Sequence, residues 1–216
     1  RYVQNTRQLG TPDLIILPGT KNTVDDLLWL RQSGLEAVLL KLAASGTPVL
    51  GVCGGYQMLG QTLDDPAGTE SGKPLSLTGL GLLPTRTMFD VQKRRTQVRA
   101  AALGAPFAGA RMTGYEIHNG RTTVNGEPFC RLVDGTPEGC VCKNVFGTYL
   151  HGLFDSGELT QALVKLLCAR KGISPRETRP TSMAEYRQAQ FDLLADGVRK
   201  ALDMGAVYRA MGMKAP

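Results

Sequence analysis

Three short runs of apolar residues, at positions 14–17, 49–52 and 145–150, place the strongest constraint on the fold of this chain. Continuous apolar runs of this length are typical of strands that are buried on both faces of a parallel sheet. Between the first two runs, apolar residues recur at helical spacing over residues 24–30 and 35–42. The order strand, helix, helix, strand, helix therefore predicts an α/β fold with a central, mostly parallel sheet flanked by helices.

The middle of the chain, residues 79–145, differs because many glycines and prolines separate its short strand-like runs. Runs at residues 97–100, 114–117 and 129–133 predict a region of short, partly antiparallel strands.

Two helices are expected after the third apolar run, near residues 158–170 and, beyond a proline-containing linker, from about residue 183 to residue 204. We predict one domain over residues 1–175, with residues 176–216 forming the linker and a C-terminal helix packed on that same domain. The packing is expected because apolar side chains recur at helical spacing on the last helix. These side chains are Phe191, Leu194, Val198 and Leu202.

Composition argues against several classes of function. The formal net charge is +6, and the densest basic cluster is Lys93-Arg94-Arg95 with Arg99. This cluster is typical of a solvated strand or loop, and no nucleic-acid-binding module accompanies it, so no nucleic-acid partner is expected. The apolar runs are far shorter than the roughly 18–20 residues of a membrane span, so no membrane association is expected. The five cysteines, odd in number and placed mostly in apolar stretches, favour the reducing cytoplasm over a disulfide framework.

The sharpest local signal is Gly-Val-Cys-Gly-Gly-Tyr-Gln-Met-Leu-Gly at residues 51–60, which places Cys53 between a buried strand and a helix. Unpaired N–H groups and the helix dipole stabilise a thiolate at a helix start, so a lowered pKa is expected for Cys53. The flanking glycines leave room for a strained turn and for a substrate. Free cysteine is also common as a small buried hydrophobe, so a nucleophilic role requires a second group nearby.

The chain has two histidines, His118 and His151. His151 follows the third apolar run, so we expect it at the sheet edge that carries Cys53, where it would act as the base. His118 alternates with Glu116 along an expected strand, and the two side chains should face the same side. His118 and Glu116 are therefore possible supporting residues, and a hydrogen-bonded structural role for His118 is the alternative.

Two backbone groups are candidate donors to an oxyanion: the N–H of Gly54 and a second N–H in the turn at Gly19 and Thr20, which follows the first strand. With Cys53 and His151 they would place a nucleophile, a base and an oxyanion hole at the ends of strands.

These motifs resemble the class I glutamine amidotransferase domain, in particular that of the cobyric acid synthase family of the cobalamin pathway. The resemblance implies that Cys53 forms a thioester with the side-chain amide of glutamine, and that Gly19, Thr20, Gly54 and Gln57 hold the oxyanion and the glutamine. It covers residues 13–155, and the terminal helix is also similar. The motifs that carry it are Leu-Pro-Gly-Thr-Lys-Asn-Thr at 17–23, the run at 51–60, Gly-Tyr-Glu-Ile-His at 114–118 and Gly-Thr-Tyr-Leu-His-Gly-Leu-Phe at 147–154.

One position departs from ordinary class I members, in which a glutamate two residues after the catalytic histidine orients it. Here that position is Leu153, as in the cobyric and cobyrinic acid synthase branch that the chain resembles. Glu116 and Asp155 are the candidates to orient His151 instead.

The resemblance also implies an ATP-binding synthetase domain upstream of Arg1, with ATP and Mg²⁺ bound there, that activates carboxylates of a corrin substrate. The chain begins without a start methionine, so we expect it to be an internal fragment of a longer protein. It has no Gly-x-x-x-x-Gly-Lys-Ser/Thr loop, so we expect no cofactor in these residues. No metal site is expected either, because Cys140-x-Cys142 lacks a partner pair at ligand spacing.

Three rival interpretations stay open at this point. One is a glutaminase of another amidotransferase branch, such as cobyrinic acid a,c-diamide synthase or the enzyme of cell-wall precursor amidation. The second is a non-catalytic docking module, which the presence of both Cys53 and His151 disfavours. The third is a cysteine peptidase or hydrolase, which shares the same chemistry.

Overall fold

A four-stranded sheet with strand order β1-β2-β10-β9 lies at the centre of the computed structural model, which describes residues 1–175 and 182–213. Strands β1 (Ile15–Leu17), β2 (Val49–Val52) and β10 (Val145–Thr148) run parallel, and β9 (Cys140–Cys142) pairs antiparallel with β10. The three parallel strands coincide with the three apolar runs. The prediction of a mostly parallel central sheet is therefore confirmed.

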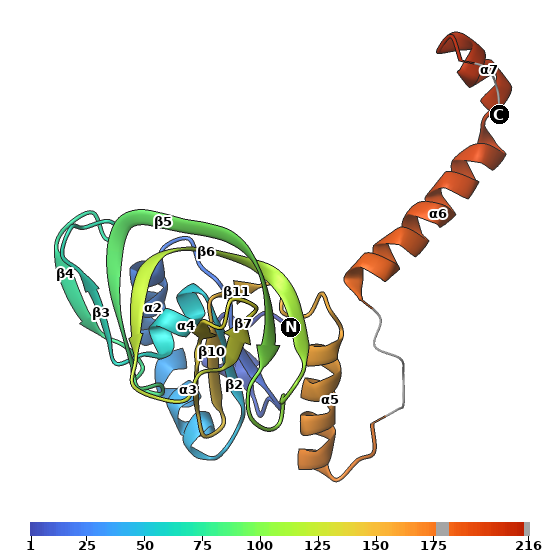
Figure 1. Cartoon of the computed structure of the whole chain (residues 1–216). Helices are drawn as coiled ribbons and strands as arrows, with labels where there is room; N and C mark the ends of the chain where they lie inside the picture. Colours follow the sequence, from blue (N-terminus) through green and yellow to red (C-terminus); the bar gives the residue numbers. More distant parts are fainter. Residues whose placement is uncertain (176–181, 214–216) are drawn as a thin grey trace.

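Helices cover both faces of this sheet (Figure 1). On one face pack α2 (Thr23–Gln32), α3 (Leu35–Ala44) and the short α4 (Gly54–Leu59), and on the other packs α5 (Glu158–Lys171). Successive strand residues point to opposite faces, so Val49 belongs to the first core and Leu50 to the second.

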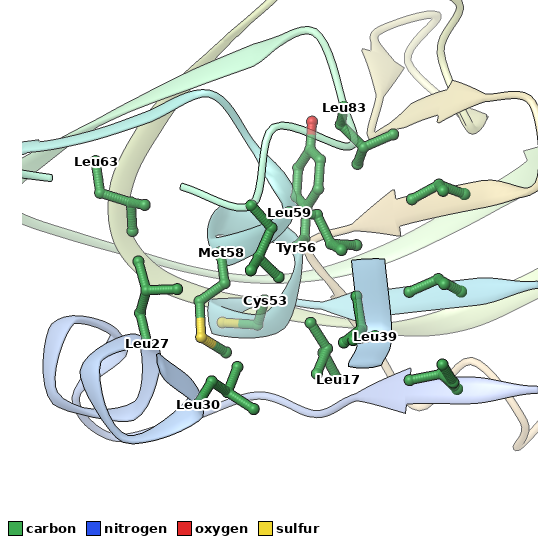
Figure 2. Close-up of a cluster of buried hydrophobic side chains, with 14 of the residues drawn as sticks. Leu17, Leu27, Leu30, Leu39, Cys53, Tyr56, Met58, Leu59, Leu63 and Leu83 are labelled. Carbon is green, nitrogen blue, oxygen red and sulfur yellow. The ribbon is translucent and has the colours of Figure 1, made fainter. Parts of the chain in front are cut away.

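The first core contains the fully buried Leu27, and Figure 2 shows it gathered with Leu30, Leu39 and Met58. Burying one such leucine stabilises the fold by about 1.5–3 kcal/mol. These contacts hold α2 against the helix that follows Cys53, which fixes the loop between β1 and α2.

A second sheet, mostly antiparallel, has the strand order β11-β6-β5-β3-β4, with β7 and β8 attached at β5. Its core is one long ribbon of two paired strands, which Figure 1 shows curving over the first sheet. The predicted antiparallel region is confirmed, but two of the predicted short strands are parts of this ribbon. The strands are β3 (Thr62–Asp65), β4 (Leu75–Thr78), β5 (Thr85–Ala102), β6 (Arg111–Val124), β7 (Cys130–Leu132), β8 (Pro137–Glu138) and β11 (Leu150–His151).

The chain passes from the first sheet to the second at Tyr149, because β10 ends at Thr148 and β11 begins at Leu150. His151 therefore lies in β11, opposite Tyr115 of β6, and not at the end of a parallel strand. His151 follows the third apolar run as expected, but it belongs to a strand of the second sheet, which the sequence did not predict.

The C-terminal helices α6 (Met183–Ala201) and α7 (Met204–Ala210) extend away from the sheets (Figure 1), whereas a short α1 (Thr6–Leu9) precedes β1. The start of α6 touches the body, since the Met183 N–H donates to the Asp155 carbonyl at 2.7 Å.

The predicted packing of the α6 apolar face on the body is not found, because Phe191 is 61% exposed and Leu194 is 63% exposed. Val198 and Leu202 are exposed as well, and α6 has no buried residue. An amphipathic pattern predicts that a helix has an apolar face, but it does not identify the surface that covers it. The division at residue 175 stays a prediction, and the linker residues 176–181 lie outside the described residues. Within the described ranges, no helix combines the length and apolarity needed to cross a membrane.

Candidate active site

Cys53 occupies a strained turn between β2 and α4, with φ 53° and ψ −111°. Left-handed φ values are uncommon for residues other than glycine, and such strain clusters at functional sites. The Cys53 N–H donates to the Thr148 carbonyl at 2.8 Å, which ties the turn to β10. Gly55 lies so close to the Leu17 carbonyl that a side chain at this position would collide with β1. The glycine run is thus a packing requirement of the turn.

The loop after β1 brings the predicted nucleophile and base together at Gly19. A Cβ atom built on Gly19 would lie 3.0 Å from Cε1 of His151 and 3.5 Å from Cβ of Cys53. The side chains of Cys53 and His151 therefore both lie next to Gly19.

The same loop meets the start of α4 at Gly54. A Cβ atom built on Gly54 would lie 3.2 Å from the Thr20 backbone nitrogen. The backbone amides of Thr20 and Gly54 are thus neighbours beside Cys53. Whether these two N–H groups stabilise an oxyanion stays a prediction from the sequence.

The imidazole of His151 stacks on the ring of Tyr115, with centroids 5.0 Å apart and planes 5° from parallel. Its Nε2 is buried and has no hydrogen-bond partner in the described part of the protein. Burial lowers the pKa of His151, so the ring is neutral at neutral pH and can accept a proton.

Neither predicted candidate orients this imidazole through a hydrogen bond or an ion pair in the described residues. Glu116 is buried and pairs with Arg94 at 2.7 Å, and Asp155 lies 3.9 Å from Arg187. The imidazole plane instead stacks on the ring of Tyr115. Sequence reasoning missed Tyr115, although its place in the Gly-Tyr-Glu-Ile-His motif could have indicated it.

His118 has its own partners, which are distinct from those of His151. Its Nδ1 lies 2.7 Å from the Gly120 carbonyl, and its ring stacks on Tyr149 with centroids 3.7 Å apart. His118 and Glu116 line one cavity of about 470 Å³, so the prediction that they share a face is confirmed. These contacts match the structural alternative for His118.

Gln57, predicted to bind glutamine, is 3% exposed and uses both ends of its amide within the protein. Its Oε1 accepts from the Thr23 hydroxyl at 3.0 Å, and its Nε2 donates to the Tyr149 hydroxyl at 3.1 Å. Gln57 therefore links α2, α4 and the junction of the two sheets.

The pKa of the Cys53 thiol differs from the sequence prediction, which expected it to be lowered. Burial raises the pKa of Cys53 to about 11, which outweighs the lowering by the Gly54 N–H. The expected helix-start stabilisation is smaller than the desolvation of a side chain that is 7% exposed. A thiol with this pKa is protonated at neutral pH. The charge of Glu70 raises the same pKa, and the charge of Lys93 lowers it.

Comparisons with known proteins agree with this geometry. A family model described as the CobB/CobQ-like glutamine amidotransferase domain matches residues 1–159. Cobyric acid synthases from Ruminiclostridium cellulolyticum and Citrobacter koseri are 41% and 46% identical to this chain, and each alignment covers 98% of it. The chain spans 43% and 44% of their lengths, which is less than half.

Solved structures share the fold. The PurLQS structure from Thermotoga maritima has a TM-score of 0.57 at 19% identity, over 77% of this chain and 85% of that one. A glutamine amidotransferase crystal structure gives a TM-score of 0.53 at 18% identity, over 79% and 85% of the two chains. Because a family model matches most of the residues and relatives above 40% identity match nearly all of them, this chain belongs to the CobB/CobQ-like glutamine amidotransferase family.

Proposed function

We propose that Cys53 and His151 hydrolyse glutamine in this chain, and that the ammonia serves ATP-dependent amidation of corrin carboxylates by the rest of a cobyric acid synthase. The observation that carries the proposal is the convergence at Gly19, where Cys53 and His151 flank one glycine and the Thr20 amide lies against Gly54. The identity to cobyric acid synthases over 98% of the chain supports the choice of pathway.

The reaction follows from the protonation states of the two side chains. As the Cys53 sulfur attacks the amide carbon of glutamine, its proton passes to the neutral His151, and the N–H groups of Gly54 and Thr20 stabilise the oxyanion. The protonated imidazole then gives its proton to the amine, which leaves as ammonia, and a glutamyl thioester remains. His151 next removes a proton from water, the hydroxide attacks the thioester, and glutamate leaves as the thiol is restored.

The ATP step belongs elsewhere in this proposal. No group of three metal-ligating side chains gathers in the described residues, and the sequence lacks a phosphate-binding loop. The relatives are more than twice as long as this chain, which leaves room for a synthetase domain that holds ATP and Mg²⁺. Five free cysteines are consistent with a reducing cytoplasm, where we place the enzyme.

We predict that glutamine hydrolysis is slow in residues 1–216 alone and faster in the whole enzyme with ATP and the corrin substrate. The Gly19-Thr20 turn is the gate in this proposal, because rotating one peptide replaces an N–H by a carbonyl at the oxyanion. Losing one such donor costs roughly 10²–10³ in rate. The measurement is kcat for ammonia release from the fragment and from the whole enzyme, with and without ATP and corrin. Equal values in all conditions would contradict the gate, and no release in any condition would contradict the proposed function.

Gly54→Ala provides a separate test of the oxyanion hole. Its methyl group would lie 2.5 Å from the Thr20 hydroxyl oxygen and 3.2 Å from the Thr20 nitrogen, so the loop must move away. We expect kcat to fall roughly 10²–10³-fold, as for the loss of one donor. Gly197→Ala is the matched control, because a side chain there meets open space. An undiminished kcat in Gly54→Ala would show that this amide pair does not serve the reaction.

A further inference from the structure

The chain crosses from β10 to β11 through residues 148–150, and this crossing connects the two proposed catalytic residues. At one end, the Thr148 carbonyl accepts from the Cys53 N–H at 2.8 Å. At the other end, Leu150 begins β11 and His151 follows it directly. The placement of the nucleophile relative to the base therefore depends on how firmly the crossing is held.

One buried carboxylate holds the crossing. Glu138 of β8 is 8% exposed, and its Oε1 accepts from the Tyr149 N–H at 2.6 Å. Its Oε2 accepts from the Thr148 hydroxyl, also at 2.6 Å. The oxygen of that hydroxyl accepts in turn from the Leu150 N–H at 3.1 Å. Glu138 thus reaches three consecutive residues of the crossing, two of them directly and one through a hydroxyl group.

The imidazole of His151 has no side-chain hydrogen bond that could replace this restraint on its backbone. Its Nε2 has no hydrogen-bond partner among the described residues, and Tyr115 contacts the ring by stacking. Leu153, at the position where ordinary class I members have the orienting glutamate, is buried in the second core. The backbone that Glu138 holds therefore has a large share in setting where the imidazole lies.

The pairing of β8 and β9 does not require this carboxylate. The backbone of Glu138 pairs with Cys130 of β7, and Cys140 pairs with Gly147 of β10 two residues later. A side chain at Gly139, between these two pairs, would collide with the Gly147 carbonyl. Strand pairing and close packing thus already fix the backbone on both sides of the turn.

Burial of the Glu138 carboxylate is unfavourable by itself. Burial raises the pKa of Glu138, whereas the hydrogen bonds from Thr148, Tyr149 and the Cys130 thiol lower it. Replacing a buried charge by a well-packed apolar side chain is often neutral or stabilising for a protein. Stability alone therefore does not explain a carboxylate here, whereas the need to hold three residues of one crossing does.

We propose that Glu138 is a positioning residue for glutamine hydrolysis, which fixes where the Cys53 sulfur and the His151 imidazole lie relative to each other by holding the crossing; this inference rests on the proposed function. The hydrogen bonds of Glu138 go to the crossing and to Cys130, and to neither reacting group. Its effect is on the proton transfer from sulfur to imidazole, which needs the two groups within hydrogen-bonding reach. A misplacement of about 1 Å costs about 10²-fold in rate.

Glu138→Gln is the first variant to measure, in the whole enzyme with ATP and the corrin substrate. The amide oxygen can still accept from the Tyr149 N–H, but the amide NH₂ group cannot accept from the Thr148 hydroxyl. We expect kcat for ammonia release to fall roughly 10–100-fold with KM changed less than about two-fold, because a positional loss acts on the chemical step. A normal kcat, or a loss that lies in KM alone, would overturn the proposal.

A double-variant comparison separates this role from a general loss of structure. It uses kcat for the wild type, Glu138→Gln, His151→Ala and the variant with both changes. If Glu138 acts through the placement of His151, Glu138→Gln should cause little further loss once the imidazole is absent. Independent effects would instead multiply, and multiplied losses would overturn the proposal.

Thr148 offers a second test that does not depend on the folding of Glu138→Gln. Thr148→Val keeps the shape of the side chain and removes the hydroxyl that binds Glu138, whereas Thr148→Ser keeps this hydroxyl. We expect a loss of kcat in Thr148→Val and a kcat near that of wild type in Thr148→Ser. Equal kcat values in the two variants would overturn the proposal.

Asn144→Asp is the matched control, because it removes hydrogen bonds at the opposite end of β10. The Asn144 amide donates to the Ala43 carbonyl at 3.0 Å and to the Thr47 carbonyl at 2.6 Å. This variant should lower the thermal unfolding midpoint and leave kcat unchanged. A loss of kcat as large as in Glu138→Gln would assign the effect to stability and overturn the role of Glu138. Absence of glutamine hydrolysis in wild-type enzyme would instead contradict the proposed function.

Discussion

Replacing Cys53 with alanine is expected to abolish glutamine hydrolysis while the fold is retained. The sulfur is the only atom lost, and the residue keeps its Cβ, so the backbone strain at φ 53° is unchanged. Without the thiol no thioester forms, and the neighbouring backbone donors have no nucleophile to assist. The measurement is ammonia release from glutamine, with the thermal unfolding midpoint as a check on the fold.

Two controls sharpen this expectation. Cys142→Ala removes another free, partly buried thiol and should leave the rate unchanged. In the whole enzyme, free ammonia should still support amidation by Cys53→Ala, because the synthetase step does not use the thiol. A normal rate of glutamine hydrolysis in Cys53→Ala would show that the nucleophile has been assigned wrongly.

Replacing His151 with alanine is expected to lower kcat by roughly 10²–10⁴-fold, the usual contribution of general acid–base catalysis. The large effect follows from the state of the thiol, since a pKa of about 11 leaves Cys53 protonated at neutral pH and dependent on a base. The pH profile gives a second measurement. Burial lowers the pKa of His151, so the imidazole is protonated only at pH values below the ordinary range near 6.5. In a plot of kcat/KM against pH, the fall on the acid side should therefore occur below this range, and it should disappear in His151→Ala.

His118→Ala is the comparison for this variant. His118 stacks on Tyr149 and lies within hydrogen-bonding distance of the Gly120 carbonyl, so we expect a smaller loss of activity and a loss of stability. A larger loss of kcat at His118 than at His151 would reverse the two assignments.

Local pattern predicted the central sheet well and the second sheet less well. Strands β2 and β10 are buried on both faces, and the edge strand β1 is buried at Ile15 and Leu17, so each strand can be recognised as an apolar run from its own residues. The ribbon of β5 and β6 carries many exposed polar residues and is held by pairing between distant positions. The lengths of these two strands therefore depend on how distant residues pair, and a local stretch of sequence contains no information on that pairing.

The candidate site could also be predicted only in part. Cys53, Gly19 and His151 each follow a strand whose apolar run marks its end, so their convergence could be predicted. Glu70 could not, because its position depends on the Asp65 carboxylate folding the next loop back toward α2. The raised pKa of Cys53 was also missed, since burial is set by the whole fold and not by the helix that follows. The rival peptidase interpretation loses support from the family match, which names a glutamine amidotransferase domain.

The passage of the chain from β10 into β11 at Tyr149 has a mechanical consequence. Cys53 follows β2 of the first sheet and His151 lies in β11 of the second sheet. A single residue separates β11 from β10, which pairs with β2. A sliding of one sheet against the other changes the separation of sulfur and imidazole directly.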